Sequence, residues 1–202
     1  MTIIKLPNIP ITSNILASYL QGYKAPAQKI VEMEKSGEIV RLKRGLFIRA
    51  SEKPNKMLLA NSIYAPSYVS RESALSYYGL IPEHVYTTTS VTINRSKVFE
   101  NMLGRFSYDY LPLPYYRLGI NLRQEDEISF QIATPEKALS DLIVLSSGIR
   151  LRYIYETKEF LENYLRLDMD VFATLKPERF EEYAIVSKKS LALSNIAKLL
   201  RR

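Results

Sequence analysis

The chain has 202 residues, of which 47% are apolar and 24% charged, a composition that suits a folded protein with a sizeable core. It contains no cysteine, which excludes disulfide bonds, thiolate zinc sites and a cysteine nucleophile. The first residues lack the layout of a signal peptide, and no apolar run approaches the roughly 18 residues that a membrane span needs. We therefore expect a cytoplasmic protein without a membrane partner.

Positive charge is concentrated at the two ends of the sequence, within a formal net charge of +7. Residues 1–50 hold eight Lys or Arg and three acidic residues, and residues 188–202 hold five Lys or Arg and no acidic residue. Residues 51–187 hold fifteen Lys or Arg and eighteen acidic residues. Such asymmetry is typical of a nucleic-acid-binding protein with a neutral companion domain. A role in solubility alone is the alternative that composition leaves open.

Two helices are predicted near the start of the chain. Residues 11–22 show an amphipathic pattern, with Gly22 available to end the helix. Residues 25–36 follow, with Pro26 in the first turn, where proline is favoured, and Gly37 after the last turn. The apolar stripe expected to face the core consists of Ile15, Leu16, Tyr19 and Leu20 in the first helix and Ile30, Val31 and Met33 in the second.

A hairpin is predicted directly after these helices. Residues 38–42 and 46–49 alternate between apolar and polar side chains, and Gly45 between them can take the positive φ of a tight turn. Two helices followed by a hairpin are the minimal order of a winged helix-turn-helix. The sequence therefore predicts a winged-helix DNA-binding domain over residues 1–50.

The polar residues of this domain are the candidate contacts to double-stranded DNA. Cations on the hairpin and beside the second helix can neutralise phosphates, and the exposed face of residues 25–36 can address base edges. A solvated basic turn is the alternative interpretation of the hairpin. The candidate DNA-binding residues are Lys24, Gln28, Lys29, Arg41, Lys43, Arg44 and Arg49.

Residues 51–55 are polar and include a proline, which indicates a domain boundary. The remainder, residues 56–202, predicts a mixed α/β domain that ends in helices, so the whole chain is predicted to be α+β. Strands are expected at 85–93, 105–111 and 127–133. Helices are expected at 56–64, at 71–78 with Ser70 as the cap, from Thr134 onward with Thr134 as the cap and Pro135 in the first turn, and at 177–186 and 190–201. A further helix is expected from Thr157 onward, with Phe160, Leu161, Tyr164 and Leu165 facing the core.

The last predicted helix is basic and amphipathic, with Leu193, Ile196, Ala197 and Leu200 on one face. Its simplest interpretation is a packed terminal helix with cations near its end. A second nucleic-acid contact or a partner-binding helix is the alternative. Association with a membrane surface ranks last, because the apolar face carries no bulky aromatic residue.

Several sequence blocks resemble the AbiEi antitoxin family of abortive-infection loci. The segment Gly37–Phe47 is similar to the wing of that family. In the second domain, the resemblance rests on Pro66–Leu75 with Tyr78–Glu83, on Thr89–Thr92, and on Ala133–Leu139 with Asp141. The second-domain blocks are the more specific part of the resemblance.

This resemblance implies a DNA-binding antitoxin that represses its own operon in a type IV toxin–antitoxin system of phage defence. It also implies a nucleotidyltransferase-type toxin as the partner, countered without a stable complex. The antitoxin-domain motif would comprise Ser70, Glu72, Ser90, Thr92, Glu136, Lys137 and Asp141. Helix capping and a buried polar network are the alternative roles of these residues.

Enzymatic activity is not expected, nor is a cofactor or a metal. The only histidine is His84, no glycine-rich phosphate loop occurs, and the one nuclease-like triplet, residues 156–158, begins a predicted helix. The alternative function is a stand-alone winged-helix transcription regulator whose C-terminal domain binds a ligand or a protein. Neutralisation of a toxin by direct contact also stays open.

Overall fold

The computed structural model describes residues 6–50, 54–83 and 85–202. Over these residues the chain is mixed α+β, with ten α-helices, one π-helical turn and two sheets, as the sequence predicts at that level. None of the described helices has the length and apolar character needed to cross a bilayer.

The N-terminal unit, residues 6–50, is a three-stranded antiparallel sheet with two helices. The strand order is β1-β3-β2, and Thr12 of β1 caps the first helix by accepting a hydrogen bond from Ile15 N at 3.4 Å. Gly45 takes the expected positive φ, +78°, in the hairpin turn. The elements are β1 (Ile11–Thr12), α1 (Ser13–Tyr19), α2 (Pro26–Lys35), β2 (Ile39–Lys43) and β3 (Leu46–Arg49).

Half of the predicted stripe of α1 is buried. Leu16 and Leu20 are fully buried, whereas Ile15 is 52% exposed and Tyr19 46% exposed, so the prediction that those two face the core is wrong. Val31 of α2 is likewise 43% exposed. These short helices pack on a small sheet, which covers only a narrow stripe of each. The core of the unit comprises Leu6, Ile11, Leu16, Leu20, Ile30, Met33, Ile39 and Phe47.

The C-terminal unit, residues 54–202, is built on a six-stranded sheet of order β6-β7-β5-β4-β9-β8. The pairs β4/β9 and β5/β7 are parallel, and the other neighbours are antiparallel. The three predicted strands are confirmed as β5, β7 and β9. The strands are β4 (Ser67–Val69), β5 (Thr87–Thr92), β6 (Lys97–Asn101), β7 (Gly104–Tyr110), β8 (Ile120–Glu125) and β9 (Ile128–Ala133).

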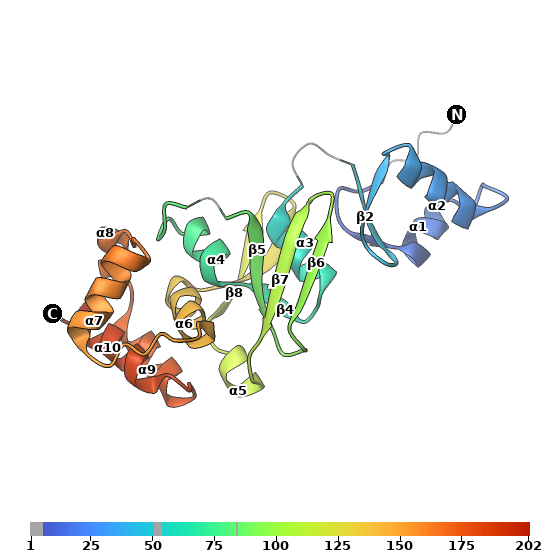
Figure 1. Cartoon of the computed structure of the whole chain (residues 1–202). Helices are drawn as coiled ribbons and strands as arrows, with labels where there is room; N and C mark the ends of the chain where they lie inside the picture. Colours follow the sequence, from blue (N-terminus) through green and yellow to red (C-terminus); the bar gives the residue numbers. More distant parts are fainter. Residues whose placement is uncertain (1–5, 51–53, 84) are drawn as a thin grey trace.

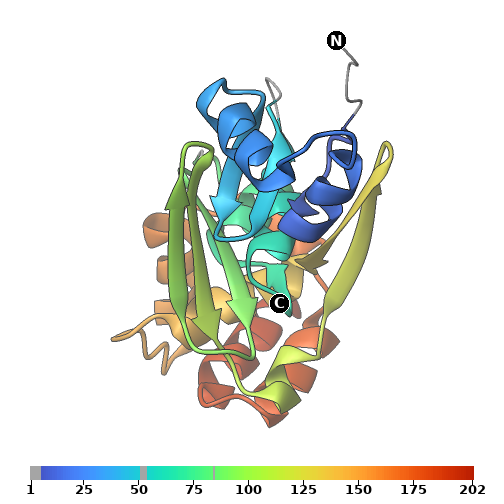
Figure 2. The same cartoon turned by 90° about the vertical axis from the view of Figure 1, so that its right-hand side faces the viewer.

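Helices cover both faces of this sheet. Figures 1 and 2 show α3 and the N-terminal unit on one face, α4 and α6 on the other, and α7 to α10 gathered at the far end of the molecule. The helices are α3 (Lys56–Ile63), α4 (Arg71–Tyr77), α5 (Leu113–Tyr116), α6 (Pro135–Leu145), α7 (Ile154–Glu159), α8 (Met169–Ala173), α9 (Pro177–Ile185) and α10 (Ser190–Leu200), with a π-helical turn η1 (Phe160–Tyr164) after α7.

Near the C-terminus, the predicted burial holds for the last helix and fails before it. Leu193, Ile196 and Ala197 of α10 are buried, as a packed terminal helix requires. Tyr164, predicted to face inward, is 74% exposed. It ends the π-helical turn, where the wider helical repeat moves a side chain away from the face that an α-helix would give it.

The β2–β3 hairpin lies between two hydrophobic cores. Ile39 and Phe47 belong to the core of the N-terminal unit. Leu42, Leu46 and Ile48 instead belong to the core of the C-terminal unit, with Leu59 and Ile63 of α3 among their companions. This division follows the alternation of side chains along the two strands, and the strand pairing has a register shift between Arg41 and Lys43. The two units are therefore joined by packing as well as by the chain.

Two hydrogen bonds reinforce the junction. Lys43 Nζ donates to the carbonyl oxygen of Ile63 at 2.5 Å, and Asn101 Nδ2 donates to the carbonyl oxygen of Leu42 at 3.0 Å. The sequence predicts Lys43 as a DNA contact on the hairpin, but its ammonium is bound to the last residue of α3. Arg44, the next residue, is exposed.

Lys43→Met should therefore lower the free energy of unfolding by about 1–2 kcal/mol, because a partly buried charged donor and its acceptor are separated. Arg44→Met should change it by less than about 0.5 kcal/mol, because the side chain is exposed and has no described partner. Urea unfolding followed by circular dichroism measures both. Equal effects of the two substitutions would contradict the role of Lys43 at the junction.

Candidate functional site

Five of the seven candidate DNA-binding residues are exposed, and all of these except Arg41 make no side-chain hydrogen bond or ion pair within the described residues. Lys24 and Gln28 lie at the start of the α2 region, and Arg44 and Arg49 lie on the β2–β3 hairpin. Within the described residues, none of the three cations forms an ion pair. These side chains are available to a partner without the loss of an internal contact.

The other three candidates make internal contacts. Lys29 Nζ lies 3.6 Å from Glu32 and 5.5 Å from the centre of the Tyr23 ring. Arg41 pairs with Glu34 of α2. Lys43 is bound to the Ile63 carbonyl, as described above. The sequence placed all seven residues in one set, and the structure divides them into four without internal side-chain hydrogen bonds or ion pairs and three that make such contacts, of which Arg41 is also exposed.

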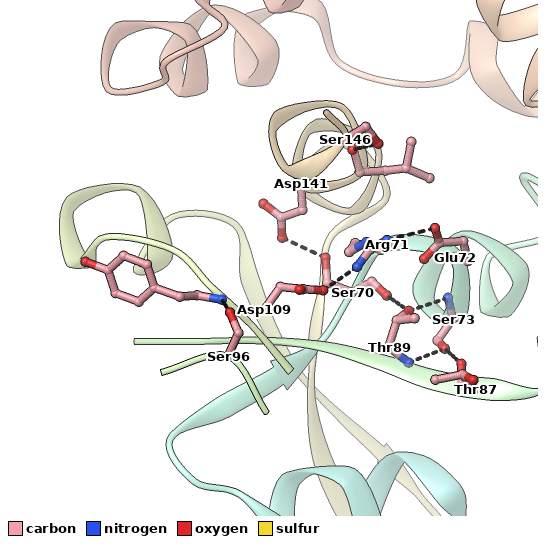
Figure 3. Close-up of polar contacts among 12 residues, drawn as sticks. Ser70, Arg71, Glu72, Ser73, Thr87, Thr89, Ser96, Asp109, Asp141 and Ser146 are labelled. Atoms are coloured by element: carbon pink, nitrogen blue, oxygen red, sulfur yellow. Dashed lines mark hydrogen bonds and ion pairs between the residues drawn. The ribbon is translucent and has the colours of Figure 1, made fainter. Parts of the chain in front are cut away.

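Three residues of the predicted antitoxin motif meet in the interior of the C-terminal unit. Asp141 of α6 forms an ion pair with Lys137, one helical turn earlier, and accepts a hydrogen bond from Ser70 Oγ at 2.6 Å. Figure 3 shows Ser70 reaching toward Asp141 from the end of β4. Tyr68 OH donates to the same carboxylate oxygen at 2.9 Å, and Lys137 Nζ donates to Tyr68 OH at 2.9 Å. These four residues, here called the Lys137 network, are all fully buried.

Aromatic rings surround the lysine of this network. Lys137 Nζ lies 3.8 Å from the ring centre of Tyr115 and 5.9 Å from that of Tyr183, distances at which a ring face attracts a cation. Gly119 makes room for this packing. A Cβ atom at Gly119, whose φ is +62°, would lie 2.8 Å from Lys137 Cβ. The rings bring α5 and α9 onto the Lys137 network.

Burial dominates the ionisation of these groups. It lowers the pKa of Lys137, while the neighbouring Asp141 carboxylate acts in the opposite direction. Burial, followed by the negative charge of Asp141, raises the pKa of Tyr68 well above its ordinary value. Burial raises the pKa of Tyr183 to about 12. Because every member of the Lys137 network is buried and bonded to another member, the arrangement stabilises the fold and offers no group to a substrate.

The remaining motif residues do not join the Lys137 network. Glu136 Oε1 accepts a hydrogen bond from Lys176 N at 3.2 Å, and Thr92 Oγ1 donates to the carbonyl oxygen of Pro66 at 2.8 Å. Ser90 Oγ is buried and has no hydrogen-bond partner within the described residues. Glu72 lies in the first turn of α4, as predicted for a residue that complements the helix dipole.

Helix capping, the alternative role proposed for the motif, does not hold at Ser70, although Thr134, which lies outside the motif, caps its helix. Thr134 caps α6, with its hydroxyl oxygen accepting from Lys137 N at 3.2 Å. Ser70 occupies the cap position of α4 but makes no cap bond, because its hydroxyl donates to Asp141.

Arg71 forms ion pairs with two carboxylates beside the motif, an arrangement that the sequence did not predict. Arg71 has a φ of +55° and pairs through Nη1 with Asp109 of β7 and through Nη2 with Glu72 at 3.2 Å. Figure 3 shows the guanidinium between the two carboxylates. Asp109 is 38 positions further along the chain, and no local pattern marks it as a partner.

Nothing in the described part of the chain groups three or more His, Cys, Asp or Glu side chains in a way that could hold a metal ion. The nuclease-like triplet has a local role, since Glu156 accepts from Arg152 N at 2.8 Å and Tyr153 N at 3.2 Å at the start of α7. His84 lies outside the described residues.

No family model matches this sequence, and a search of curated proteins found no match.

Lys137→Met should lower the free energy of unfolding by about 3–5 kcal/mol, because it leaves the Asp141 carboxylate buried without its cation. The matched control is Lys158→Met. Lys158 Nζ lies 3.6 Å from Glu162 in an exposed pair, so this change should cost less than about 0.5 kcal/mol. Urea unfolding measures both variants. A cost for Lys137→Met as small as the control would show that the fold does not depend on the buried pair.

Proposed function

We propose that the N-terminal unit is a winged helix that binds double-stranded DNA, and that the chain is an antitoxin-type repressor of its own operon. The order β1-α1-α2-β2-β3 with a three-stranded antiparallel sheet supports this proposal. In such a module, α2 enters the major groove and the β2–β3 hairpin is the wing.

The observation that carries the proposal is the exposed, unpaired charge of this unit. Lys24, Arg44 and Arg49 are exposed cations without an acidic partner among the described residues. Glu32 and Glu34 of α2 are compensated by Lys29 and Arg41, which reduces the repulsion between the recognition helix and phosphate. Gln28, exposed in the first turn of α2, is the candidate for base contacts.

The basic C-terminal segment has weaker support as a second DNA contact. Lys189 Nζ donates to the carbonyl oxygen of Ile143 at 2.8 Å and to that of Ser146, at the end of α6. Arg201 pairs with Glu181 and lies 3.5 Å from Glu178. These cations hold helices together, and Figure 1 shows their helices at the opposite end of the molecule from the N-terminal unit.

The Arg44→Ala/Arg49→Ala double variant should weaken DNA binding and flatten its salt dependence. Each phosphate contact contributes about −0.9 to the slope of log K against log salt, so losing two contacts should flatten the slope by about 2. The measurement is binding of the full chain to its own upstream intergenic DNA and to a random duplex, over a series of salt concentrations.

Lys198→Ala/Arg202→Ala is the matched control for this experiment. It removes the same charge from two exposed side chains at the far end of the molecule and should leave the slope unchanged. An unaltered slope in the hairpin variant, or an equal change in both variants, would remove the β2–β3 hairpin from the DNA interface.

The antitoxin part of the proposal rests on the resemblance of the second-domain blocks to the AbiEi family. Ser70, Lys137 and Asp141 of that motif are buried and bonded to one another, so they support the fold of the unit and are not available to a toxin surface. This placement favours antagonism of the toxin without a stable complex. The buried motif residues would then maintain the fold and would not contact the toxin.

Co-expression tests this part. With the nucleotidyltransferase toxin encoded beside it, the full chain should restore growth and should elute separately from the toxin in gel filtration. The Arg44→Ala/Arg49→Ala variant should restore growth as well, because it changes the DNA-binding unit alone. A co-eluting complex would favour neutralisation by direct contact. Failure to restore growth, with DNA binding intact, would favour a stand-alone regulator.

A further inference from the structure

A cleft of about 570 Å³ lies on the side of the C-terminal unit opposite α3. Its walls come from α4, the end of α6 with the loop that follows, the segment after α4, and the end of η1. The volume falls within the range of small-molecule sites. Five of the lining side chains are apolar: Ile81, Val85, Leu142, Ile149 and Leu165.

The charged side chains that line this cleft are acidic. Glu72 and Glu83 contribute carboxylates, and no described lysine or arginine is among the lining residues. Each carboxylate is paired with an arginine outside the lining, Glu72 with Arg71 and Glu83 with Arg166, so the described charged groups that face the cleft itself are acidic. Such a lining repels phosphate groups and attracts a cation.

Glu72 has unused capacity to accept hydrogen bonds. Its Oε1 accepts one bond from Arg71 Nη2 at 3.2 Å, and that guanidinium also neutralises Asp109. Its Oε2 is buried and has no described donor, although a carboxylate can accept about four hydrogen bonds. One arginine therefore serves two carboxylates, and Figure 3 shows Glu72 on the side of Arg71 away from Asp109. A donor that carries positive charge would complete this arrangement.

The rim of the cleft offers a second feature that suits a cation. Tyr164 is 74% exposed and stacks on Phe160 with ring centres 5.2 Å apart, which holds the ring in place. A fixed, exposed aromatic ring attracts an ammonium or guanidinium group placed over its face. At the same rim, Glu83 lies 3.4 Å from Arg166 in an exposed pair that contributes little energy.

We infer that this cleft binds a small organic cation, an ammonium or guanidinium group carried on an apolar body. Glu72 accepts its N–H donors, the apolar wall contacts its body, and Tyr164 covers the charged group. The inference does not depend on DNA binding or on toxin antagonism, because the cleft is formed entirely by the C-terminal unit.

Calorimetric titration of the full chain with 2-phenylethylamine, 2-phenylethylguanidine and 2-phenylethanol tests the inference. The amine should bind at least about tenfold more tightly than the alcohol, because the two differ in the charged donor alone. Glu72→Gln keeps an acceptor for Arg71 and should weaken amine binding by about tenfold while leaving alcohol binding unchanged. 2-Phenylethylguanidine, which has the same apolar body, shows whether a guanidinium serves as well as an ammonium.

Three further variants secure the interpretation. Ser147→Trp places a large side chain in the cleft from an exposed loop position and should abolish binding. Glu100→Gln removes an exposed carboxylate on β6, away from the cleft, and should leave binding unchanged. Glu83→Gln replaces Glu72→Gln if the latter does not fold. Three results would overturn the inference. They are equal binding of 2-phenylethylamine and 2-phenylethanol, no effect of either cleft carboxylate variant on amine binding, and no binding of either organic cation at millimolar concentration.

Discussion

Both faces of the β2–β3 hairpin are buried, and the relation between the two units depends on that packing. One face supplies Ile39 and Phe47 to the N-terminal core, and the other supplies Leu42, Leu46 and Ile48 to the C-terminal core. A hairpin held from both sides cannot move independently of either unit. Its exposed cations therefore have a defined position relative to the six-stranded sheet.

Burial separates the polar residues of the C-terminal unit into two kinds. The Lys137 network contains an ion pair, a serine and a tyrosine, residue types that are also found in active sites. Each of its members is enclosed and bonded to another, and the rings of Tyr115 and Tyr183 close it further. The cleft beside Glu72 is the reverse case, because it is lined by the exposed Glu83 and Tyr164 and because Glu72 Oε2, although buried, has no hydrogen-bond partner within the described residues. Accessibility and unmet bonding capacity mark it as the better candidate for a ligand.

Elements with strong local signals could be predicted. Thr134 as the cap and Pro135 in the first turn predict the helix α6, and the β-branched residues of β5 predict that strand. The edge strands β6 and β8 were missed because they carry exposed polar residues and show no alternation. The three-residue strand β4 was missed because it is fully buried and lies between two other strands, so it lacks any alternating pattern.

Sequence by itself determined the properties that depend on near neighbours or on composition: the basic ends, the two helices and hairpin at the start, the turn at Gly45 and the cap at Thr134. Tertiary structure alone decided which polar side chain meets which partner. Ser70 is 71 positions from Asp141, and Lys43 is 20 positions from Ile63. Contacts over such separations arise only when strands and helices pack. As a result, Ser70, an expected helix cap, donates to a buried carboxylate, and Lys43, an expected phosphate contact, binds the C-terminal unit.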